Sequence, residues 1–204
     1  MNNFYQLKVT LTETTPAVWR RFVVPASITL DRLHDVLQIV MGWEDSHLHD
    51  FIFKKKIYTE LPESSTDEYE AVTRLNELLK KKGNTLIYRY DFGDDWLHEI
   101  TLEDKNYFPD EMLCPFECIE GEMICPMEDC GGPGSYTHML EIINNPHNNK
   151  EGFEELLEII GVPDADPKEL EELVCSFDID EVNSALALYS RWSRDRELPL
   201  IDDY

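Results

Sequence analysis

Two hydrophobic patterns divide this 204-residue chain, and together they restrict it to folds that combine a sheet with helices. Up to about residue 105, apolar and polar residues alternate in several short segments, which is the pattern of half-buried strands. From residue 135 onward, apolar residues recur every three or four positions, which is typical of amphipathic helices. The sequence therefore predicts an α+β fold, with a mixed-sheet first half packed against a C-terminal group of helices.

The first half is expected to begin with a β-hairpin, on which a helix packs, and to continue with further strands. A helix is predicted from Leu30 to Met41, because Thr29 suits its N-cap and Gly42 its end. The Gly93-Asp94-Asp95 sequence is typical of a hairpin turn. The predicted strands are 5–11, 18–24, 49–58, 86–92 and 96–103, and a short helix is predicted around 72–79.

The second half is predicted to be irregular from 106 to 134 and helical afterwards. Asp166 and Asp178 each precede an apolar stripe at the spacing of a helix N-cap. One α+β domain is expected over residues 1–193, with a β-rich half at 1–105 and a loop and helical half at 106–193. Residues 194–204 have no periodicity, so the sequence predicts a flexible tail there.

The chain is strongly acidic, and its charge is uneven. The formal net charge is −24, and residues 106–204 alone hold 24 acidic and 5 basic side chains. A negative field of this kind repels phosphate backbones, so direct binding of duplex DNA is not expected. No apolar run approaches the length of a membrane span, and no basic segment precedes an apolar one at the start. A cytoplasmic protein without membrane association is therefore expected.

Five cysteines form an odd set, which favours reduced thiols in a cytosolic protein over a disulfide framework. Four of them fall close together, at Cys114, Cys118, Cys125 and Cys130. Their spacings lack the paired Cys-x₂-Cys elements of most structural zinc sites, so they are the weaker metal candidates. They could equally pack in the core of a loop.

Histidines on the predicted strands are the stronger candidates for a site. His47 and His49 lie two residues apart, so they share a strand face, and His98 shares a face with Trp96. If these strands belong to one sheet, His47, His49 and His98 could converge with Asp50 or Asp91 as nitrogen and oxygen ligands of a divalent metal. The alternative is that each histidine is partly buried and hydrogen-bonded among aromatic neighbours.

Asp91 belongs to a group of three aspartates at the predicted hairpin turn. Carboxylates of this kind can bind a metal or act in acid–base chemistry. Turns also favour aspartate, because its side chain bonds its own backbone, and this simpler interpretation covers Asp94 and Asp95. Asp91 is the better functional candidate because it lies outside the turn proper. The sharpest expectation is that His49, Asp91 and His98 lie in one cleft, with His47 at its rim.

Three groups of residues resemble the plasmid pRiA ORF-three-like family, relatives of a passenger protein of an insertion element. They are PAVWRR at 16–21 with LH at 33–34, MGW at 41–43 and HLHDF at 47–51, then YDFGDDWLH at 90–98, and PMEDCGGPGSY at 126–136. The resemblance spans residues 4–190 and implies an α+β fold and a history with plasmids and mobile elements. It implies no reaction. Met127 stands where the family tends to carry proline, which alters loop stiffness more than chemistry.

Two functions from different classes fit these observations. The favoured hypothesis is a non-enzymatic accessory or interaction module that recognises a protein or nucleoprotein partner. The alternative is a metal-dependent hydrolase that acts on a phosphodiester or nucleotide through His47, His49, Asp91 and His98. No cofactor is predicted, although a divalent metal remains open. The sequence leans away from an enzyme.

Overall fold

The computed structural model describes residues 3–108 and 114–192, and these form an α+β fold, as predicted. Eight strands in the described residues make one sheet in the order β5-β4-β3-β6-β7-β1-β2-β8. All neighbours are antiparallel except β4 and β5. The strands are β1 (Phe4–Leu11), β2 (Trp19–Pro25), β3 (His49–Phe53), β4 (Lys56–Thr59), β5 (Glu68–Tyr69), β6 (Thr85–Tyr90), β7 (Trp96–Tyr107) and β8 (Glu117–Glu122).

The helices of the described residues divide between the two halves of the chain. Two of them and a single 3₁₀ turn interrupt the strands, and the other four follow β8. They are α1 (Leu30–Met41), η1 (Glu70–Val72), α2 (Leu75–Leu78), α3 (Gly132–Asn144), α4 (Lys150–Ile160), α5 (Pro167–Val174) and α6 (Ile179–Trp192), with a 3₁₀ turn η2 (Pro146–Asn148) between α3 and α4. The predicted helical character of the chain after residue 135 is confirmed. The predicted tail at 194–204 lies outside the described residues.

The two predicted hairpins lie side by side in the middle of the sheet. β1 pairs with β2 in one hairpin and with β7 of the other, and β6 pairs with β3. This order places the start of β3 and the β6–β7 turn at the same end of the sheet, because His49 pairs with Tyr90 and Tyr90 with Trp96. Segments that are about 40 residues apart in sequence are therefore neighbours there.

Two strand predictions were wrong in detail. The predicted strand 49–58 is a hairpin of β3 and β4, because Lys54 and Lys55 form a turn with φ of 49° and 70°. Lysine carries no sequence signal for a left-handed conformation, so this turn was not foreseen. The stretch 106–134 contains β8, which pairs with β2. Only Cys118 of this strand is buried, so β8 lacks a clear alternating pattern.

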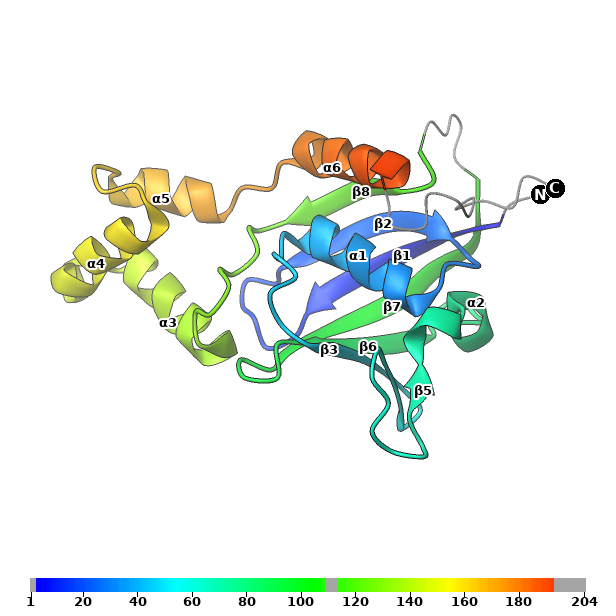
Figure 1. Ribbon diagram of the computed structural model, residues 1–204. Coiled ribbons are helices and arrows are strands. Elements are labelled where there is room, and N and C mark those ends of the chain that lie inside the picture. The colour runs from blue at the N-terminus through cyan, green and yellow to red at the C-terminus, as the bar shows by residue number, and fades with distance from the viewer. Residues whose placement is uncertain (1–2, 109–113, 193–204) are drawn as a thin grey trace.

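The core lies between α1 and one face of the sheet (Figure 1). Leu33 and Leu37 of α1 and Leu7 and Val9 of β1 are fully buried, and each such aliphatic side chain contributes about 1.5–3 kcal/mol by leaving water. α1 ends at Gly42, whose φ of 102° lets the following Trp43 N–H donate to the Gln38 carbonyl at 3.0 Å. The chain therefore turns sharply after α1 and returns to β3 over the end of the sheet.

The C-terminal helices meet the sheet at two places. α6 lies along β8 and α1, where the Tyr189 hydroxyl donates to Asp35 at 2.7 Å. α3 is anchored by Tyr136, which is 1% exposed and contacts Trp96 edge to face. α4 and α5 extend beyond the sheet (Figure 1). No helix among the described residues is long and apolar enough to cross a membrane.

Candidate functional site

Three segments that are distant in sequence meet around His47. They are the loop between α1 and β3, the β6–β7 turn, and the segment between β8 and α3. His47 Nε2 lies 3.3 Å from Asp129 Oδ1, 3.5 Å from Glu128 Oε2 and 3.8 Å from Asp91 Oδ2. We call His47, Asp91, Glu128 and Asp129 the motif junction, because each of the three sequence motifs supplies at least one of them.

Asp91 is positioned by the turn that follows β6. Its φ is 56°, and its Oδ1 accepts the Gly93 N–H at 2.8 Å. The Asp91 N–H in turn donates to the Leu48 carbonyl at 3.0 Å, which ties the turn to the loop of His47. These bonds leave Oδ2 directed at His47, although Asp91 is only 7% exposed. The turn therefore presents one carboxylate oxygen to the junction.

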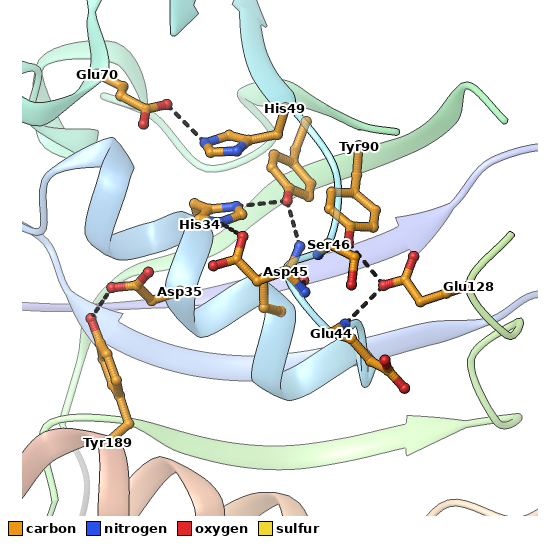
Figure 2. Close-up of polar contacts among 12 residues, drawn as sticks. His34, Asp35, Glu44, Asp45, Ser46, His49, Glu70, Tyr90, Glu128 and Tyr189 are labelled. Atoms are coloured by element: carbon orange, nitrogen blue, oxygen red, sulfur yellow. Dashed lines mark hydrogen bonds and ion pairs between the residues drawn. The ribbon is translucent and has the colours of Figure 1, made fainter. Parts of the chain in front are cut away.

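Glu128 is held through only one of its two carboxylate oxygens. Its Oε1 accepts from the Glu44 N–H and from the Tyr90 hydroxyl, each at 2.8 Å (Figure 2). Burial and the contact with Glu128 raise the pKa of Tyr90, so this phenol keeps its proton and donates it. Glu128 Oε2 and His47 Nε2 are both buried, and neither makes a hydrogen bond within the described residues. The junction thus contains two unsatisfied polar atoms that face each other.

Two glycines bring the third segment close to the turn. The Gly131 N–H donates to Asp94 Oδ2 at 2.9 Å. Gly132 has a φ of 78°, and a Cβ atom there would lie 2.7 Å from the Asp94 carbonyl oxygen. Glycine is therefore required at this position both by conformation and by contact. This close approach is what places Glu128 and Asp129 beside His47.

The junction has the donor set of a divalent metal site. One ligand atom each from His47, Asp91 and Asp129 lies within 4.8 Å of the others, and these residues form the one such group found in the described chain. Carboxylates with a single imidazole suit divalent ions such as Mn²⁺ and Zn²⁺. An ion here would also satisfy the buried nitrogen of His47, which otherwise lacks a hydrogen bond.

A cleft of about 490 Å³ opens beside His47, and we call it the histidine cleft. The rings of His34 and His49 stack in its lining, with centroids 3.6 Å apart and planes within 3° of parallel. His34 Nε2 lies 2.9 Å from Asp45, and His49 Nε2 lies 3.0 Å from Glu70 (Figure 2). Each imidazole is thus paired with its own carboxylate, an arrangement that fixes the ring and supports proton transfer.

A buried network holds the histidine stack from below. The Tyr88 hydroxyl lies 2.8 Å from His34 Nδ1 and accepts from the Gln38 amide at 2.8 Å. The Gln38 side-chain oxygen accepts a hydrogen bond from the Asp45 N–H. Since Asp45 also contacts His34, these contacts form a closed ring. Burial holds the pKa of Tyr88 well above its ordinary value, so the phenol is neutral. The cleft floor is therefore fixed by the fold.

The structure brings together only some of the predicted site residues. His47 and Asp91 meet in the motif junction, and His49 lies in the adjacent histidine cleft. His98 does not join them. It is fully buried, its Nε2 accepts from Trp43 at 3.0 Å, and its Nδ1 lies 3.3 Å from the Tyr88 carbonyl. The expected single cleft of His49, Asp91 and His98 is corrected accordingly.

The cysteines form no ligand group among the described residues. Cys118 and Cys125 are buried, and the Cys114 thiol lies 3.7 Å from the Leu186 carbonyl. Burial raises the pKa of Cys118 and of Cys130 to about 11, so both remain protonated thiols at neutral pH. All five cysteines are free, as the sequence predicted.

Several residues of the site were not identified from the sequence. Glu128 and Asp129 belong to the third of the motifs that resemble the family, but they were not among the predicted site residues. His34 lies in α1 and Glu70 in η1, and the packing of α1 against η1 brings them to the same cleft. No spacing rule connects a helix, a loop and a strand end. The three motifs were the available signal, because each supplies a residue of the junction.

Comparisons with known proteins point to relatives of the same length and fold. The family model of plasmid pRiA4b ORF-3-like proteins matches residues 3–185. The uncharacterized protein y4hQ of Sinorhizobium fredii is 34% identical over 200 residues, covering 93% of this chain and 94% of that protein. A crystal structure of MM3350, a protein of unknown function from Methanosarcina mazei Go1, is similar with a TM-score of 0.71 and 29% identity, covering 89% and 98% of the two chains.

Proposed function

Since this chain belongs to the family of plasmid pRiA4b ORF-3-like proteins, whose relatives named above have no described activity, we propose from the site itself that it is a metal-dependent binding module. A divalent ion binds at the motif junction and holds three loops together. These loops border the histidine cleft, where a partner binds. The function is recognition, and the ion organises the surface that performs it.

One observation carries this proposal. His47 faces three carboxylates at 3.3–3.8 Å, and its buried Nε2 has no hydrogen bond within the described residues. An uncompensated group of like charges around one imidazole is costly when partly buried, and a divalent cation would offset that cost. The residues come from three separate segments, so an ion would cross-link loops that hydrogen bonds join only in part.

Metal binding tests the proposal directly. We expect the purified protein to bind about one equivalent of Mn²⁺ or Zn²⁺ in a calorimetric titration after treatment with a chelator. Asp129→Asn and His47→Gln should each weaken binding at least about tenfold, since each removes a ligand. Asp164→Asn is the matched control, because Asp164 is exposed and lies between α4 and α5, the two helices that extend beyond the sheet. Equal affinity in all four proteins, or no binding at all, contradicts the proposal.

A metal-dependent hydrolase is the second candidate, and the paired histidines support it. An ion at the junction would supply an activated water, and the His49–Glu70 pair beside it could transfer a proton. The carboxylates that line the cleft would repel an anionic phosphodiester, so we favour the binding module over the hydrolase. Metal-dependent turnover of bis(p-nitrophenyl) phosphate that is lost in His49→Gln would reverse this order.

A further inference from the structure

Two clefts form one continuous groove around the start of β3. The histidine cleft shares Leu48, His49 and Glu60 with a second cleft of about 380 Å³. The first cleft is mainly polar, whereas the second is bordered by Ile57, Leu61 and Phe92. A ligand that fills both must therefore offer a polar group next to an apolar one. We call the combined feature the β3 groove.

Acidic side chains predominate in the lining of the β3 groove. Four carboxylates line the first cleft and four line the second, with Glu60 common to both. Asp50 is paired with Arg89, but the lining residues of the two clefts include no lysine or arginine. The three histidines of the first cleft are the remaining basic groups of the lining. The potential of the groove therefore favours a cationic ligand.

Glu70 shows where the cation would be held. Its side chain is only 4% exposed, and its Oε2 contacts His49 Nε2 at 3.0 Å. Its Oε1 has no hydrogen-bond donor among the residues that the structure describes, although Glu70 lines the cleft. A carboxylate oxygen that opens on the cleft and has no donor can accept a charge-assisted hydrogen bond from an ammonium or guanidinium group of a ligand.

Exposed apolar side chains gather beside the same groove. Leu48 is 66% exposed, Leu61 71% and Phe92 49%. Tyr69 and Val72, which flank Glu70 in sequence, are 59% and 74% exposed. An apolar border of this kind around a polar cleft is typical of a protein interaction site rather than of a site for a small amine.

We propose that the β3 groove binds a segment of a partner protein in which a lysine or arginine lies next to an apolar residue. The cationic group enters the histidine cleft and bonds Glu70 Oε1, with Glu60 nearby, and the apolar side chain packs on Leu61 and Phe92. This rests on the binding-module part of the proposed function. Its contacts are separate from the ligands of the ion, because none of Glu60, Glu70, Leu61 and Phe92 belongs to the motif junction.

Fluorescence anisotropy with a labelled hexapeptide of alternating arginine and leucine tests this assignment. We expect saturable binding to the full-length protein, which Glu70→Gln and Glu60→Gln each weaken at least about fivefold, and Leu61→Ser about threefold. Glu154→Gln and Leu188→Ser are the matched controls, because both residues are exposed on helices away from the groove. These controls separate specific binding from the general attraction of a cationic peptide to an acidic protein.

Other outcomes would overturn the assignment. If an arginine–serine peptide binds as tightly as the arginine–leucine peptide, the apolar part of the groove is not used. If free arginine amide binds as tightly, the occupant is a small cation. Equal weakening by Glu154→Gln would show that only net charge matters. The Mn²⁺ affinity of the variants keeps the two proposals separate, because Glu70→Gln should weaken peptide binding and leave Mn²⁺ binding unchanged, whereas Asp129→Asn should weaken Mn²⁺ binding.

Discussion

His98, on β7, and His47, in the loop that leads into β3, have opposite environments. His98 is fully buried, and each of its ring nitrogens contacts a neutral partner, the Trp43 indole or the Tyr88 carbonyl. The side chain of His47 is 24% exposed and faces three carboxylates, and its Nε2 has no hydrogen bond within the described residues. The sequence predicted a strand position for both, but His47 lies in the loop before β3. What separates a structural histidine from a candidate ligand is whether its polar atoms are satisfied.

The same contrast extends to the neighbouring carboxylates. Asp50 is buried but forms an ion pair with Arg89 across β3 and β6, so its charge is compensated. One carboxylate oxygen of Glu128, Oε2, is buried and has no hydrogen-bond donor within the described residues. Asp91 directs its Oδ2 to His47. Compensated groups stabilise the sheet, whereas the uncompensated ones collect where the three motifs meet. Variants that affect only one of the two sets can test this division.

Loss of His98 should have the largest effect on stability. His98→Ala removes a fully buried ring and leaves the Trp43 indole N–H without an acceptor, so we expect the free energy of unfolding to fall by about 3–5 kcal/mol. Metal affinity should be unchanged, because His98 lies outside the junction. Urea unfolding and a metal titration on the same protein measure the two quantities. A fall in the free energy of unfolding below about 1 kcal/mol would show that the buried contacts of His98 do not stabilise the fold.

Acid should destabilise the protein partly through His98. Burial lowers the pKa of His98 to about 4, below its ordinary value of 6.5. The unfolded state therefore binds a proton first as the pH falls, and the contribution of His98 is complete above pH 6.5 and is lost towards pH 4. This contribution of His98 to the free energy of unfolding amounts to about 3 kcal/mol. The difference in unfolding free energy between the wild type and His98→Gln, measured from pH 7 to pH 4, should shrink by that order, and a constant difference would contradict the expectation.

The sequence predicted the sheet and the helices well because each of those elements has its own local pattern. The hairpins β1–β2 and β6–β7 alternate clearly, and α1 has a stripe that ends at Gly42. β8 was missed because it lies at an edge of the sheet, where only Cys118 is buried. The β3–β4 turn was missed because its left-handed residues are lysines.

The site was harder to predict because its residues are joined by tertiary contacts. Alternation correctly put His98 on the face of Trp96, yet it could not show that Trp43, from the loop after α1, covers that face. His47 and Asp91 were identified as candidates, and the pairing of β3 with β6 explains why they meet. Glu128 could be assigned to the same place only once the approach of Gly132 to the β6–β7 turn was known.

Gly132→Ala should have the smallest effect on stability. It is also the most specific test of how the junction is built. A Cβ atom at Gly132 would lie 2.7 Å from the Asp94 carbonyl oxygen, so the segment that carries Glu128 must move away from the turn. Gly83 is the matched control, because its φ of 82° is close to the 78° of Gly132 while a Cβ there would meet nothing within 4 Å. Both alanine variants should lose about 1–2 kcal/mol for the left-handed conformation. Only Gly132→Ala should also weaken binding of Mn²⁺ or Zn²⁺, because only there does the side chain separate Asp129 from His47. Chemical unfolding and calorimetric titration of the two variants measure this difference, and equal metal affinities would mean that the close approach at Gly132 does not build the site.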